Sequence, residues 1–109
     1  GFAWSNWNGG PPNVMPRRYG NFFWRQAYNF REVGIHSAYI AMLDEYDEGT
    51  AILPAADSYL SKPTDQYFLT YSADGVYCSS DFYLRLAGEI TKLIKKEIPS
   101  SSKRACRRR

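Results

Sequence analysis

Cysteine and histidine are scarce in this sequence, and long apolar runs are absent. Two cysteines, Cys78 and Cys106, and one histidine, His36, stand among 109 residues. They offer no metal-ligand spacing, so we expect no structural disulfide, no metal and no cofactor. No apolar stretch approaches the roughly 18 residues of a membrane span, and no cleavable signal is visible. No Ser/His/Asp or Cys/His set for nucleophilic catalysis can be assembled, and no phosphate-binding loop is present.

Basic charge is concentrated at the carboxyl end of the chain. The formal net charge is +3, but five of the fourteen basic residues lie between positions 103 and 109. Residues 1–102 carry nine basic and eleven acidic side chains, a net charge of −2. The body therefore has no basic surface for nucleic acid, and we expect neither a nucleic-acid nor a membrane partner. We predict a disordered basic tail over 100–109; the alternatives are a nucleic-acid arm or a sorting tail.

The apolar pattern of the body predicts strands alternating with helices. Phe2 to Trp4 is typical of a strand end, and a long Gly/Pro-rich loop follows from Ser5 to Tyr19. Helical spacing covers Asn21 to Val33, with Gly34 as its stop. The run from Ile35 to Leu43 is nearly continuous in apolar residues, which is typical of a strand buried on both faces.

The clearest element is a helix from Ser80 or Asp81 to about Glu97, with Pro99 behind it. Two strand-to-helix units in series indicate an α/β fold with a parallel sheet, whose catalytic groups belong at the carboxyl ends of the strands. The predicted apolar stripe of this helix comprises Tyr83, Leu86, Ala87, Ile90, Leu93 and Ile94.

Four acids directly follow the predicted buried strand: Asp44, Glu45, Asp47 and Glu48. Cleavage of a glycosidic bond needs one carboxyl group as an acid and a second as a base or nucleophile. Glu45 and Glu48 could present such a pair to one cleft, and Gly49 would let the backbone turn closely beneath a substrate. Two other interpretations stay open, a solvated turn and a calcium site made by Asp44, Asp47 and Glu48.

Further polar and aromatic residues are candidates for contacts with a sugar. Rings can stack on a sugar face, and amides can bind hydroxyl groups. The alternatives are packing of the loop on its own aromatics, core packing of the helical residues, and pairing of the arginines with the acids. The predicted substrate-binding residues are Trp4, Asn6, Trp7, Arg17, Trp24, Asp44 and Tyr46.

Several blocks, in order, resemble the glycoside hydrolase 71/99-like family. The resemblance covers about residues 1–99 and leaves the basic tail outside. Its main blocks are Gly1-Phe2-Ala3-Trp4, Pro16-Arg17-Arg18-Tyr19-Gly20-Asn21-Phe22-Phe23-Trp24-Arg25-Gln26, Tyr39-Ile40-Ala41-Met42-Leu43-Asp44-Glu45-Tyr46-Asp47-Glu48-Gly49-Thr50 and Ser80-Asp81-Phe82-Tyr83-Leu84-Arg85-Leu86-Ala87-Gly88.

The resemblance implies the carboxyl-terminal portion of a (β/α)8 barrel, with about strands seven and eight and their helices. In family 99, the endo-acting α-mannosidases and α-mannanases, the equivalent loop reads Asn-Glu-Trp-x-Glu-Gly-Thr, and both glutamates are catalytic. Carried over, Glu45 is the base at the sugar 2-hydroxyl and Glu48 the acid/base at the leaving oxygen. Asp44 and Tyr46 depart from that pattern, so mannoside specificity does not follow; relatives of the closer type are labelled xylosidase or arabinosidase.

Taken together, these patterns predict a retaining glycoside hydrolase acting on a polysaccharide or glycan, secreted or periplasmic. A complete barrel needs about 250 residues. We therefore expect the 109 residues by themselves to be inactive and poorly stable. Two alternatives remain: a carbohydrate-binding relative without catalysis, and a binder of nucleic acid or membrane surfaces that acts through the arginine-rich tail.

Overall fold

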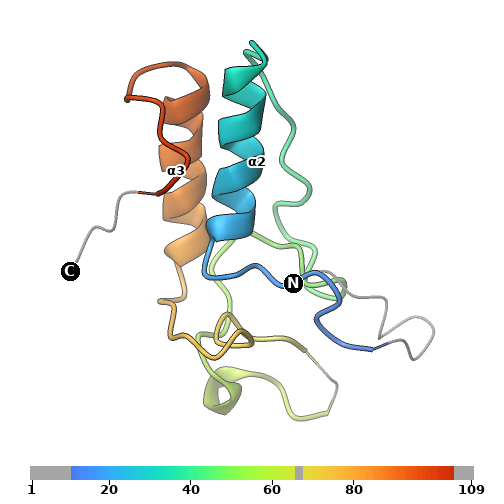
Figure 1. The fold of residues 1–109 in the computed structure, drawn as a ribbon. Coiled ribbons are helices and arrows are strands. Elements are labelled where there is room, and N and C mark those ends of the chain that lie inside the picture. Colours follow the sequence, from blue (N-terminus) through green and yellow to red (C-terminus); the bar gives the residue numbers. More distant parts are fainter. Residues whose placement is uncertain (1–10, 66–67, 105–109) are drawn as a thin grey trace.

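The computed structural model describes residues 11–65 and 68–104. Within them the regular elements are two α-helices, α2 (Asn21–Glu32) and α3 (Phe82–Ile94), and one 3-10 turn, η1 (Tyr59–Ser61). The two helices lie side by side and run in the same direction (Figure 1). The connection between them therefore returns from the end of α2 to the level of its start. Neither helix of the described chain is long and apolar enough to cross a membrane.

The prediction of an α/β fold, as part of a (β/α)8 barrel, is wrong. The described residues contain no strand. Ile35 to Leu43, predicted as a buried strand, is an irregular extended segment in which the side chain of Tyr39 is 85% exposed. A buried strand needs neighbours to pair its backbone N–H and C=O groups, and residues 36–41 make no backbone–backbone hydrogen bond with any described residue. The predicted strand end at Phe2 to Trp4 lies outside the described residues.

Helix α2 confirms the helix predicted over Asn21 to Val33. Val33 is its C-cap, and Gly34 follows with a φ of 82°. Gly20 occupies the N-cap with a φ of 79°, and a Cβ atom there would lie 2.5 Å from Cδ2 of Leu86 on α3. Two features therefore require glycine at position 20: the left-handed backbone and the close approach of the two helices.

Helix α3 confirms the predicted apolar stripe, since all six of its residues are buried. The helix ends at Ile94 instead of Glu97. Lys96 has a φ of 61°, and its backbone N–H donates to Leu93 while that of Glu97 donates to Lys92, which closes the last turn. Asp81 stands at the N-cap, but its carboxylate accepts from Ser79 and pairs with Arg85 at 3.1 Å instead of capping a helical N–H group.

The core lies between the helices and under the long connection. Tyr71 and Tyr83 meet edge to face with ring centroids 4.6 Å apart, and Tyr19 stacks on Phe82 at 4.9 Å. The connection thus reaches the core through a few side chains and not through a sheet. The buried cluster comprises Trp24, Ala27, Ile52, Tyr71, Cys78, Phe82, Tyr83, Leu86, Ala87, Ile90, Leu93 and Ile94.

The segment from Ser100 to Arg104 returns along α2. The indole N–H of Trp24 donates to the carbonyl of Ser101 at 2.9 Å, and Arg104 donates to the carbonyl of Tyr19 at 3.0 Å. The guanidinium of Arg104 also lies over the rings of Tyr19 and Phe82. The first half of the predicted tail thus contacts the helices, whereas residues 105–109 lie outside the described residues.

Candidate functional site

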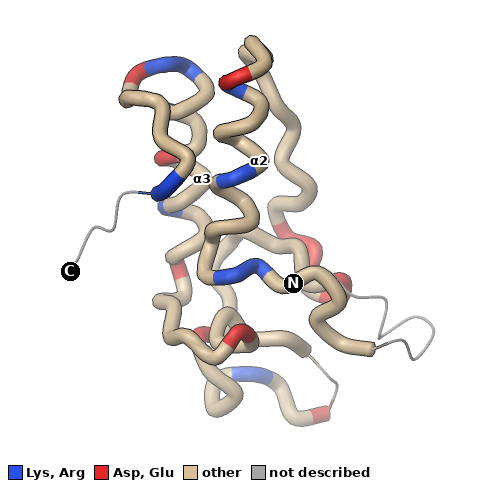
Figure 2. The backbone as a smooth tube through the Cα atoms, in the orientation of Figure 1, with Lys and Arg blue, Asp and Glu red and all other residues tan. Residues whose placement is uncertain are grey.

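The acidic loop is closed at its base by backbone hydrogen bonds. Met42 donates to Thr50 at 3.3 Å, and Ile52 donates back to Met42 at 3.2 Å. Inside the loop, the N–H groups of Thr50 and Ala51 both donate to the carbonyl of Glu45 at 3.0 Å. The backbone between these points is therefore held as a compact turn. Figure 2 shows its acidic positions beside α2, on the side away from α3.

The two predicted catalytic glutamates have different surroundings. The Oε1 atom of Glu45 accepts from the backbone N–H of Asp47 at 3.1 Å and of Glu48 at 3.4 Å, so this carboxylate is turned back over its own loop. Glu48 is half-buried, and no described residue donates to its carboxylate. Asp44 is exposed beside them. No group of three acidic, histidine or cysteine side chains within the described residues is placed to hold a metal ion.

Arg17 ties the acidic loop to the core. Its Nη2 atom donates to the carbonyl of Gly49 at 2.9 Å, and its guanidinium lies 4.4 Å from the ring centroid of Tyr83 and 5.1 Å from that of Tyr71. Desolvation lowers the pKa of Arg17 and raises that of Tyr71 to about 12. Desolvation likewise raises the pKa of Tyr83, although the nearby Arg17 charge opposes this shift.

The structure brings some of the predicted sugar-binding residues together and separates others. Tyr46 lies in the acidic loop, where its hydroxyl donates to the carbonyl of Pro54 at 3.1 Å. Arg17 meets the same loop at Gly49, and Asp44 is part of it. Trp24 is buried in the core with its indole N–H already bonded, so its ring is not available to stack on a ligand. The remaining candidates, Trp4, Asn6 and Trp7, lie outside the described residues.

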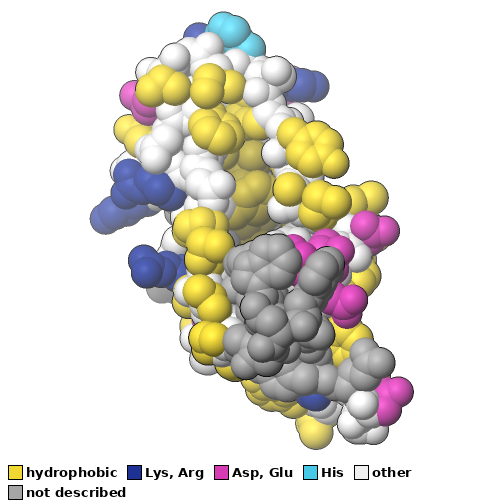
Figure 3. Space-filling model, turned by 90° about the vertical axis from the view of Figure 1, so that its right-hand side faces the viewer, with side chains coloured by type: hydrophobic (Ala, Val, Ile, Leu, Met, Phe, Trp, Pro, Cys, Tyr) yellow, Lys and Arg dark blue, Asp and Glu magenta, His cyan; other side chains and the backbone are white. Residues whose placement is uncertain are grey.

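A pocket of about 550 Å³ opens beside the acidic loop, and sequence reasoning did not anticipate it. It lies between α2, α3 and the extended segment around Tyr39, and it reaches the acidic loop at Gly49 and Thr50. Figure 3 shows hydrophobic side chains gathered around a hollow on this face, with acidic side chains below it. A signal was present in the sequence: Phe22, Gln26 and Phe30 recur every four residues on α2, on a face other than that of the core residue Trp24.

Comparison with known proteins adds no relative. No protein-family model matches the chain, and neither a curated protein nor a solved structure is similar to it. The resemblance to the glycoside hydrolase 71/99-like family therefore stays a prediction, as does the secreted or periplasmic location.

Proposed function

We propose that this chain supplies the catalytic carboxylates of a retaining glycoside hydrolase, with Glu45 and Glu48 as the pair. The observation that carries the proposal is the asymmetry of the two side chains. Backbone donors fix the carboxylate of Glu45, whereas no described residue bonds that of Glu48. A fixed carboxylate suits a base that requires one orientation, and an uncommitted one suits a group that gives and regains a proton. The proposal requires the acidic loop and the backbone hydrogen bonds that close it, and it does not require a (β/α)8 barrel.

In the proposed reaction, Glu45 takes the proton of the sugar 2-hydroxyl while that oxygen attacks the anomeric carbon. Glu48 gives its proton to the departing oxygen, so the glycosidic bond breaks as an anhydro-sugar forms. Water then opens this intermediate, with Glu48 removing the proton of the water and Glu45 returning a proton to the 2-oxygen. Two successive displacements at the anomeric carbon retain its configuration.

Arg17 has a supporting role in this proposal. Its bond to the Gly49 carbonyl fixes the backbone directly after Glu48, and its contacts with Tyr71 and Tyr83 anchor that point to the core. Asp44 and Tyr46 flank Glu45 in the chain and are proposed to contact the sugar. A carboxylate pair on a loop anchored in this way keeps its separation between turnovers, which catalysis by positioned groups requires.

The test is the release of reducing sugar from a panel of α-linked and β-linked polysaccharides by the full-length natural protein. We expect activity on one substrate, and a loss of at least about a hundredfold in both Glu45→Gln and Glu48→Gln. Glu89→Gln is the matched control, because it is the same chemical change on the outer surface of α3, where the carboxylate pairs with Lys92. Activity that survives both loop changes would contradict the proposal. Retention on a polysaccharide gel without product would instead favour the carbohydrate-binding alternative.

A further inference from the structure

The pocket beside the acidic loop differs from that loop in the kind of side chains that line it. Apolar and aromatic groups dominate its walls, and the carboxylates of the acidic loop do not line it. Its volume of about 550 Å³ lies within the range of sites that bury a small organic molecule. Such walls match hydrocarbon better than a sugar, whose hydroxyl groups would lose hydrogen bonds to water without replacement. The apolar walls include Phe22, Phe23, Phe30, Tyr39, Ile40 and Ile90.

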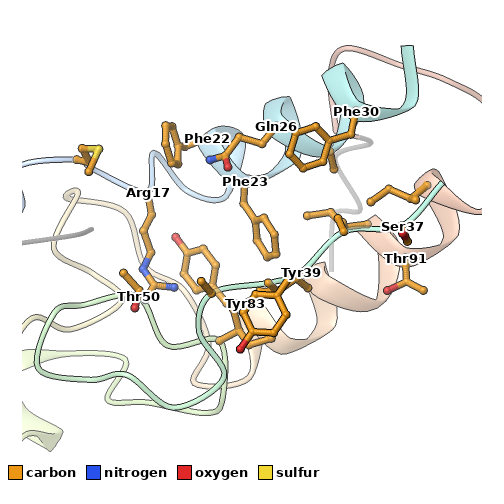
Figure 4. Close-up of a pocket in the computed structure, with 18 of the residues that line it drawn as sticks. Arg17, Phe22, Phe23, Gln26, Phe30, Ser37, Tyr39, Thr50, Tyr83 and Thr91 are labelled. Carbon is orange, nitrogen blue, oxygen red and sulfur yellow. The ribbon is translucent and has the colours of Figure 1, made fainter. Parts of the chain in front are cut away.

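One end of this pocket is polar and cationic. Figure 4 shows the guanidinium of Arg17 beside Thr50 at this end, with Phe30, Ser37 and Thr91 at the other. Arg17 donates to the Gly49 carbonyl, also bonds the side chain of Tyr71, and forms no ion pair with a described residue. A guanidinium has five N–H donors, so others remain available to a ligand. Thr50 contributes a buried Oγ1 atom that has no hydrogen-bond partner among the described residues.

The acid whose charge reaches Arg17 is already engaged elsewhere. Asp74 accepts from the side-chain amide of Asn13 at 3.0 Å and from the backbone N–H of Arg18 at 2.7 Å. Burial lowers the pKa of Arg17, which means that its charge is incompletely solvated. A ligand carboxylate that reaches the Arg17 guanidinium through an apolar channel would form a charge-assisted hydrogen bond with it. Such a bond is strong because the apolar walls shield it from water.

We infer that this pocket binds a fatty acid, with the carboxylate at Arg17 and Thr50 and the hydrocarbon chain along Phe23 and Tyr39 toward Phe30. The carboxylate accepts from guanidinium N–H groups other than the one bonded to Gly49 and from the Thr50 hydroxyl, which turns from its buried position to donate. The chain removes apolar wall area from water, which is favourable in proportion to that area. This binding function is independent of glycoside hydrolysis.

The opposite end of the pocket provides a control. Lys95 also lines the pocket, but it lies at the exposed end of α3, where water screens its charge. Arg17 and Lys95 therefore carry the same charge at two places of different burial. A fatty acid held as inferred depends on Arg17 and hardly on Lys95.

The experiment is a calorimetric titration of the protein with decanoate, below its micelle-forming concentration, and with decan-1-ol as the uncharged probe. We expect one decanoate per chain and at least about tenfold weaker binding of decan-1-ol. Arg17→Gln should weaken decanoate binding by about tenfold or more, Thr50→Val by a smaller factor, and Lys95→Gln by less than about twofold.

Thr50→Val keeps the test decisive if Arg17→Gln fails to fold, because valine preserves the shape of threonine and removes only the hydroxyl. Circular dichroism establishes that each variant remains helical. Equal affinity for decanoate and decan-1-ol would overturn the inference. Equal losses in Lys95→Gln and Arg17→Gln, saturation at many decanoates per chain, or the absence of binding would overturn it as well.

Discussion

Helix α3 and the segment from Ile35 to Leu43 are both rich in apolar residues, yet they have opposite environments. Leu93 on α3 is 0% exposed, whereas Leu43 in the segment is 53% exposed. A helix satisfies its backbone hydrogen bonds within itself, so its apolar stripe can pack as soon as one neighbour is present. An extended segment needs partner strands before its apolar side chains can be buried, and no described residue forms a backbone hydrogen bond with residues 36–41. Hydrophobicity alone therefore does not decide burial in this protein.

The largest loss of stability is expected for a substitution at Leu93, on the buried face of α3. Leu93→Ala should lower the free energy of unfolding by about 2–5 kcal/mol, because it leaves a cavity in the core between the helices. Leu84→Ala makes the same change on the same helix at a side chain that is 41% exposed, and it should cost about 1 kcal/mol or less. Urea denaturation followed by circular dichroism measures both. Equal losses would mean that the buried face of α3 is assigned incorrectly.

The close approach of the two helices gives the next largest effect. Gly20→Ala should cost roughly 2–4 kcal/mol, since a left-handed backbone disfavours alanine and the added Cβ meets Leu86. Gly75→Ala has the same φ of 79° but open space around its Cβ position. It should cost only about 1 kcal/mol, from the backbone alone. If the two variants unfold at the same urea concentration, the close contact between Gly20 and Leu86 does not contribute to the free energy of unfolding.

Tyr71 belongs to the connection between the two helices, yet its side chain is buried in the core. Its hydroxyl donates to the carbonyl of Leu53, and Tyr71→Phe should cost about 1–3 kcal/mol at neutral pH by leaving that carbonyl unpaired. Tyr77→Phe is the exposed control. The Tyr77 hydroxyl donates to Asp57 at 3.3 Å, and the expected loss is below about 1 kcal/mol. Thermal unfolding at matched protein concentration distinguishes them.

The same residue predicts a loss of stability at alkaline pH. Desolvation raises the pKa of Tyr71 to about 12, above the ordinary value of 10.0, so folding favours its neutral form. Its contribution is complete below about pH 10 and is lost as the pH rises through 12. Phenolate absorbance should show delayed titration, and Tyr71→Phe should reduce the decline of the unfolding midpoint over this window. A decline of the same size in the variant would exclude Tyr71 as its source.

The smallest effect is expected at Tyr39, in the extended segment. Tyr39→Ala removes a side chain that is almost fully exposed, so the free energy of unfolding should change by no more than about 0.5 kcal/mol. A loss above about 1 kcal/mol in urea denaturation would show that the segment is packed, which would remove the contrast with α3.

Both helices were predictable because their evidence is local. The spacing over Asn21 to Val33 and the stripe from Tyr83 to Ile94 specify which residues lie on one face, and Gly34 marks a stop. The boundary at Ile94 was missed because the left-handed residue Lys96 is not a glycine and so gives no sequence signal. The acidic loop was recognised from its composition, but the bond from the Asp47 backbone to the Glu45 carboxylate could not be.

The amino-acid pattern was sufficient to predict the presence of both helices, the buried stripe of α3 and the acidic loop, because each depends on residues close together in the chain. The tertiary structure was needed to show that the backbone of residues 36–41 has no partner among the described residues, that Arg17 meets Gly49, and that the face of α2 away from Trp24 lines a pocket. These features join distant residues, and a hydrophobic pattern records that a side chain favours burial without specifying the partner that buries it.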